Sequence, residues 1–126
     1  MRAIWPAEKP FFVRVSATDH LSGGWALDDT IAFARELKSL GVDVVDCSSG
    51  GFTGAAHNAF TDYHVPYAAQ VTRETGISTM AAGLITRPEQ AEAIIAEGSV
   101  ALVGLARQAL AEPNWPHQAN EALGRV

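Results

Sequence analysis

Hydrophobic residues follow two alternating patterns along the chain. Short apolar segments rich in β-branched residues predict strands over residues 11–17, 42–49, 77–83 and 100–105. Between them, apolar residues spaced three and four apart predict helices over residues 28–41, 65–76, 86–98 and 107–113. The chain is therefore expected to consist of four consecutive strand–helix units, with a glycine-rich loop over residues 50–64.

Residues at the helix starts support these boundaries. Asp28 is expected to cap the first helix, because a short polar side chain there can accept a backbone N–H. Thr86 and Glu89 have the spacing of a capping box at the start of the third helix. The buried face of the first helix is expected to hold Phe33, Leu37 and Leu40.

Alternating strands and helices predict an α/β fold with parallel strands joined by right-handed crossovers. Two architectures fit this order. One is a small open doubly wound sheet. The other is half of an eight-stranded (βα)8 barrel, since a whole barrel needs about 250 residues. Hydrophobic periodicity alone does not choose between them.

Composition limits the class of protein. The 126 residues suffice for one domain, and 48% hydrophobic with 18% charged residues excludes a disordered chain. Nine basic residues scattered among fourteen acidic ones form no patch for nucleic acid. No apolar run approaches the roughly 20 residues needed to cross a bilayer. A single cysteine excludes an internal disulfide and a cysteine-based zinc site, and the simplest setting is a reducing cytoplasm.

Two glycine-containing turns are candidates for binding an anion. Gly83 follows the third strand, where it would let a ligand approach backbone amides closely. Arg107 follows Gly104 at the start of the fourth helix, where a cation opposes the helix dipole unless an anion lies between them. In barrels the loops after strands 7 and 8 form a recurrent phosphate site. If the four units are strands 5 to 8, these turns fall on those two loops.

Arg14 lies inside an otherwise apolar strand. It occupies either an edge position with its guanidinium in solvent or a position facing a ligand, for which a fixed fork of donors is suited.

Other polar residues give weaker signals. Cys47 is expected to be a packing residue. His57 and His64 flank the long loop and are expected to be solvated. Asp43 and Asp46 are expected to be solvated or locally hydrogen-bonded, although a carboxylate pair for acid–base chemistry is conceivable.

Four segments together resemble a known family. "FFVRVSATD", "GVDVVDCSSGG", "VPYAAQVTRETGISTMAAGLIT" and "VALVGLARQALAEPNWP" are similar, in this order, to the C-terminal half of old yellow enzyme flavoproteins. This family comprises NADH:flavin oxidoreductases, and the bacterial ene-reductase and NADPH dehydrogenase branch is the most similar. The resemblance implies that residues 1–126 form strands 5 to 8 of an FMN-binding TIM barrel.

The resemblance also implies roles for five residues. Arg14 matches an arginine that meets the flavin ring, where a cation would favour the reduced, anionic flavin. Gly83 and Leu84 match the turn whose amides bind the FMN phosphate. Ala106 and Arg107 match the pair that completes this phosphate site. NAD(P)H is the implied reductant, and the implied substrates are enone-type activated alkenes.

No catalytic residue is assigned in this chain. The family's histidine/asparagine or histidine/histidine pair and its tyrosine proton donor belong to the first four strands, which this sequence does not match. Whether the chain is itself an enzyme is therefore left open. A C-terminal fragment of an FMN-dependent oxidoreductase is favoured. The alternatives are a non-catalytic phosphate-binding half-barrel, acting by self-association or with a separate N-terminal half, and a small flavodoxin-like binding domain.

Overall fold

The structure, a computed structural model, describes residues 2–49 and 64–125. All four predicted strands and all four predicted helices are confirmed, with ends shifted by a few residues. A 3-10 helix η1 and a helix α5 lie outside the predicted elements. The elements are η1 (Arg2–Ile4), β1 (Phe12–Ser16), α1 (Leu27–Ser39), β2 (Val44–Ser48), α2 (Val65–Thr75), β3 (Ser78–Ala82), α3 (Pro88–Ala96), β4 (Leu102–Gly104), α4 (Arg107–Ala111) and α5 (Trp115–Ala122). His57 and nearly all of the predicted loop lie outside the described residues.

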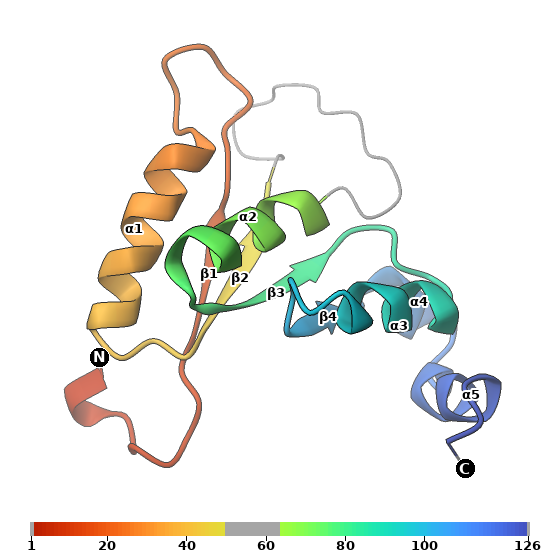
Figure 1. Cartoon of the computed structure of the whole chain (residues 1–126). Helices are drawn as coiled ribbons and strands as arrows, with labels where there is room; N and C mark the ends of the chain where they lie inside the picture. The colour runs from red at the N-terminus through yellow and green to blue at the C-terminus, as the bar shows by residue number, and fades with distance from the viewer. Residues whose placement is uncertain (1, 50–63, 126) are drawn as a thin grey trace.

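The strand order decides between the two architectures. The strands form one parallel sheet in the order β1-β2-β3-β4, without the reversal of direction that defines a doubly wound sheet. Because right-handed crossovers in a constant direction place every connecting helix on the same face, this order gives a singly wound arc. The doubly wound alternative is therefore wrong, and the fold is a four-unit arc of a TIM barrel (Figure 1).

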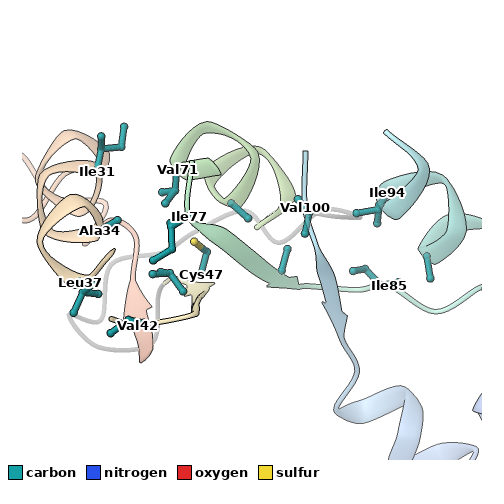
Figure 2. Packing of buried hydrophobic residues seen from close by; sticks show 14 of the residues in the cluster. Ile31, Ala34, Leu37, Val42, Cys47, Val71, Ile77, Ile85, Ile94 and Val100 are labelled. Carbon is teal, nitrogen blue, oxygen red and sulfur yellow. The ribbon is translucent and has the colours of Figure 1, made fainter. Parts of the chain in front are cut away.

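The hydrophobic core lies between this arc and the helices. Figure 2 shows α1, α2 and α3 in a row on one side of the strands, with their apolar side chains directed toward the sheet. Alternate strand residues complete this layer, since successive side chains of a strand point to opposite faces. The strand residues buried here include Val45, Cys47, Thr79 and Ala81.

The other face of the sheet is only partly covered in the described part of the chain: Val44 and Asp46 of its central strand β2 are buried, but residues of the outer strands are exposed. The register places Arg14, Asp46, Met80 and Leu102 side by side across this face. Phe12 is 42% exposed and Leu102 is 40% exposed, although both are large and apolar. In a closed barrel such residues point inward and are covered by the remaining strands. We call this surface the concave face.

Neither helix is capped as predicted: the N-cap residue of α1 is Ala26 and that of α3 is Arg87, in place of Asp28 and Thr86. Helix α1 begins at Leu27, so its third residue is Asp29. The Asp29 carboxylate bonds back to the start of the helix, where it accepts the N–H of Ala26 at 2.9 Å. Asp28 is therefore not the cap. In α3, Gln90 Oε1 accepts the N–H groups of Thr86 and Arg87 at 3.0 and 3.3 Å. Gln90 takes the role predicted for Glu89, because the helix begins at Pro88.

The predicted face of α1 is only partly correct. Leu37 is buried, but Phe33 and Leu40 are 41% and 66% exposed. Phe33 lies near the β1 edge of the sheet, where its ring makes an edge-on contact with Trp25 at 6.3 Å between centroids. Leu40 follows the last helical turn, and Gly41 then reverses the chain with a φ of +81°. The buried residues of α1 are Thr30, Ile31, Ala34 and Leu37.

The first prediction concerns the uncovered strands. Edge strands with exposed apolar residues favour pairing with another chain, so the purified chain is expected to self-associate at concentrations on the order of tens of micromolar. Phe12→Lys and Leu102→Lys place charges on the two edge strands and are expected to reduce association. Gel filtration with light scattering measures this. A monodisperse, fully folded monomer of the unaltered chain would contradict the prediction.

The second prediction compares two leucines of one segment. Leu37→Ala leaves a cavity between α1 and the sheet and is expected to lower the unfolding free energy by about 2–5 kcal/mol. Leu40→Ala removes an exposed side chain and is expected to change it by less than about 0.5 kcal/mol. Urea denaturation of both variants gives the comparison, and equal losses would mean that the described core is incorrect.

Candidate functional site

A pocket lies where the strands end. Its volume is about 390 Å3, and it is lined by residues that follow β3 and β4 together with Arg14 of β1 and His64. Because parallel strands bring their carboxyl ends to one edge, residues far apart in sequence meet there. The lining residues are Arg14, His64, Ala82, Gly83, Leu84, Ile85, Thr86, Gly104, Leu105, Ala106, Arg107, Gln108 and Ala111.

The turn after β3 has an unusual backbone. Gly83 has a φ of +128°, and Leu84 has a φ of +54° in the left-handed region. For a residue with a side chain this conformation costs roughly 1–2 kcal/mol. Gln90 braces the turn, since its Nε2 donates to the carbonyl of Leu84 at 3.2 Å. Backbone strain that is held in place beside a pocket is typical of functional sites.

Backbone N–H groups in this turn are available to a ligand. Within residues 2–49 and 64–125, no hydrogen bond uses the N–H of Gly83 or Leu84. Both residues line the pocket. Unsatisfied amide donors beside a concavity are suited to an anion.

The turn after β4 adds further donors. Gly104 ends the strand opposite Ala82, and a side chain at this position would lie 3.4 Å from the Ala82 Cβ, so small residues keep this end of the pocket open. Arg107 begins α4 and is exposed. In the described part of the chain no carboxylate forms an ion pair with it. Its guanidinium is therefore free to bind an anion in the pocket.

Arg14 is partly exposed to solvent, and its guanidinium is also held by two partners on β2. Its Nη1 lies 2.6 Å from Oδ2 of Asp46, and its Nη2 donates to the Ser48 hydroxyl at 3.0 Å. Its side chain is 59% exposed and lines the pocket. The sequence missed this pair, because its partners are 32 residues apart and meet only through the strand register.

The two aspartates of the β2 segment do not form a catalytic pair. Asp43 accepts the N–H of Phe11 at 2.7 Å and lies 3.5 Å from Arg2, before β2 begins. Asp46 is buried within β2 and pairs with Arg14. Both carboxylates are therefore hydrogen-bonded, but to residues 32 positions away in the sequence and not to local partners as expected.

His64 differs from the expectation that it is solvated. It is 3% exposed, because it directly precedes α2 and turns inward, where Nε2 lies 3.1 Å from the Ser49 hydroxyl. It also lines the pocket. Pro66, which restrains the first turn of α2, was the only local signal that the chain is fixed here.

Cys47 lies on the opposite face from the pocket. Its side chain is fully buried among the core residues (Figure 2). Burial, with a smaller contribution from the nearby negative charge of Asp46, raises the pKa of its thiol from 9.0 to about 12. The expectation of a packing residue is confirmed.

Residues 2–49 and 64–125 contain neither a metal-binding cluster nor a membrane-spanning helix. No three His, Cys, Asp or Glu side chains there form a group that could hold a metal ion. No helix in the same part of the chain is both long enough and apolar enough to span a membrane.

Sequence comparison finds known proteins that match nearly the whole chain. The sequence profile of the NADH:flavin oxidoreductase / NADH oxidase family matches residues 3–125. The chain is 41% identical over 124 residues to an NADPH dehydrogenase from Geobacillus sp., and 42% identical over 126 residues to one from Listeria monocytogenes serotype 4a. These alignments cover 98% and 100% of this chain, but only 36% and 37% of the two relatives. The chain thus spans little more than a third of the length of the curated relatives it matches.

A solved structure supports the fold. Histamine dehydrogenase from Rhizobium sp. 4-9 superposes with a TM-score of 0.71 over 90% of this chain and 17% of that chain, at 19% sequence identity. At this identity the likeness concerns the fold alone. All five residues to which the family resemblance assigns cofactor contacts line the pocket described above.

The third prediction concerns Cys47, which is the one cysteine in the sequence. Because only the thiolate reacts rapidly, its raised pKa and burial are expected to prevent alkylation of the folded chain by iodoacetamide at pH 8. Unfolding in urea exposes the thiol and is expected to allow rapid alkylation. The rate for the folded chain is expected to keep rising above pH 9, toward the folded-state pKa of about 12. Mass spectrometry follows the reaction, and equal rates in the two states would contradict the prediction.

Proposed function

Because the chain belongs to the NADH:flavin oxidoreductase / NADH oxidase family, we propose that it supplies the FMN-phosphate half of an oxidoreductase that transfers hydride from NAD(P)H through FMN to activated alkenes. One observation carries the proposal. The two turns that the sequence marks as anion-binding, the second of which includes Arg107, line the same pocket as Arg14.

The residues present are suited to a ligand with an anionic end. The free N–H groups of Gly83 and Leu84 and the unpaired guanidinium of Arg107 are donors with no acceptor in the described part of the chain. Charge-assisted hydrogen bonds of this kind are stronger than those between neutral groups. In the proposal they hold the phosphate of FMN, with Ala106 allowing close approach.

Arg14 has a different role in the proposal. It comes from β1, on the other side of the β2 strand from the phosphate turns, and it presents its guanidinium to the flavin ring. A positive group there favours the more negative, reduced form of the ring. When bound, FMN supplies the acceptor and donor of the hydride, and the residues of this chain bind and orient it.

A second function is favoured by the exposed apolar residues of the concave face. Phe12 and Leu102 are exposed at opposite edges of the sheet, a pattern typical of a surface that another chain covers. The alternative is a non-catalytic phosphate-binding half-barrel that pairs with a second copy or with a separate N-terminal half. Binding of phosphate compounds without flavin preference would favour this alternative.

The fourth prediction tests the phosphate site. The chain is expected to co-elute with FMN in gel filtration and to retain its absorbance between about 350 and 500 nm. Removing one charge-assisted contact is expected to weaken FMN binding about 10- to 100-fold, so Arg107→Ala is the variant of choice. Riboflavin lacks the phosphate, and its binding is expected to be weak and insensitive to this substitution.

Arg87→Ala is the matched control. Arg87 is also an exposed arginine at the start of a helix, but it does not line the pocket. It is expected to leave FMN binding unchanged. An equal loss in both variants, or no flavin in any soluble fraction of the unaltered chain, would contradict the proposed site.

A further inference from the structure

Asp46 is a buried carboxylate whose role the proposed function does not explain. It lies on the concave face of β2 and is 5% exposed. Its Oδ2 bonds to Arg14, while its Oδ1 is buried and has no hydrogen-bond partner in the part of the chain that is described. Burying a carboxylate is costly unless its charge is compensated. The group that compensates the charge of Asp46 therefore indicates its role.

The strand register shows which residues lie beside Asp46 and could compensate its charge. Asp46 pairs across the sheet with Arg14 on one side and with the neutral Met80 on the other. Along its own strand face its neighbours are Val44 and Ser48, which are also neutral. Arg14 is therefore the one cation directly beside Asp46 on this face of the described sheet.

The same contacts fix the orientation of Arg14. Its guanidinium is planar, and it is held at two nitrogens by two acceptors from one strand, Asp46 at 2.6 Å and Ser48 at 3.0 Å. A guanidinium has five N–H donors in a rigid fork. These two bonds leave three donors for a ligand, while the side chain remains 59% exposed in the lining of the pocket.

We infer that Asp46 is a positioning residue that holds the Arg14 guanidinium toward the pocket and offsets its positive charge. This inference rests on the proposed function. The end of the pocket that meets the flavin ring then presents a nearly neutral pair instead of a full cation. Because the reduced ring carries more negative charge than the oxidised ring, Asp46 limits how strongly the pocket favours the reduced cofactor.

The positioning role is tested without any flavin. In nitrogen-15 NMR spectra of the ligand-free chain, the Arg14 guanidinium is expected to show distinct Nη signals with slow rotation, as two fixed acceptors require. This measurement needs no substitution and therefore does not depend on whether a variant folds. Averaged signals from a freely rotating guanidinium would overturn the inference.

The charge role is tested with flavin bound. Asp46→Asn keeps the size of the side chain and an acceptor oxygen but removes the charge. The ratio of the dissociation constants of oxidised and reduced FMN is expected to rise about tenfold, equal to about 30 mV for a two-electron couple. Spectroscopic titration against a reference dye measures this ratio, which a purely structural residue would not change.

Two further variants separate the positioning role from the charge role. Ser48→Ala removes the second anchor without changing any charge, so it is expected to loosen the Arg14 NMR signals and leave the ratio unchanged. Asp43→Asn makes the same charge change at the other end of the sheet, beside Arg2, and is expected to leave both readouts unchanged.

The outcomes distinguish this inference from the proposed function. Failure of the unaltered chain to bind FMN overturns the proposed function and the charge role, while the NMR signals still decide the positioning role. Binding of FMN with an equal shift in the Asp46 and Asp43 variants overturns the charge role alone. If Asp46→Asn binds FMN but leaves the ratio of the two dissociation constants unchanged, the charge role is also overturned.

Discussion

The structure depends on one constraint: every crossover between its parallel strands has the same hand and the same direction. The order β1-β2-β3-β4 follows the order of the chain, so all connecting helices lie on one face of the sheet. The opposite face carries the Arg14–Asp46 pair and the exposed apolar residues of the outer strands, and all four strands end along one edge. Both the buried core and the pocket follow from this arrangement, because one needs the helix-covered face and the other needs the shared edge.

Local sequence predicted the elements well, since each strand is a short apolar run and each helix has its own periodicity and a glycine or proline near its ends. Local sequence was less accurate for features that depend on the exact position of a single residue. The N-cap residues are Ala26 and Arg87 instead of Asp28 and Thr86, and the side chains that bond back to them, Asp29 and Gln90, are fixed by where each helix begins. It also placed Phe33 and Leu40 in the core, although the neighbours that would cover them are set by the sheet edge and by the chain reversal at Gly41.

The site was predictable as a set of residues but not as a set of contacts. Gly83 and Arg107 are marked by their positions after strands, and the structure places them in one pocket. The bond between Arg14 and Asp46 depends on register across two strands, and the burial of His64 depends on how its segment packs. Neither has a signal within a short stretch of sequence, because both arise from residues brought together by folding.

The pocket turns lie close together along the chain, and this has an evolutionary consequence. The two turns after β3 and β4, the brace supplied by Gln90 and the arginine that begins α4 all fall within residues 78–111. A recombination event that exchanged this segment between barrels would transfer the whole set of anion donors in one step. The Arg14–Asp46 pair is encoded upstream on β1 and β2, so the two groups of pocket residues could be exchanged independently between barrels.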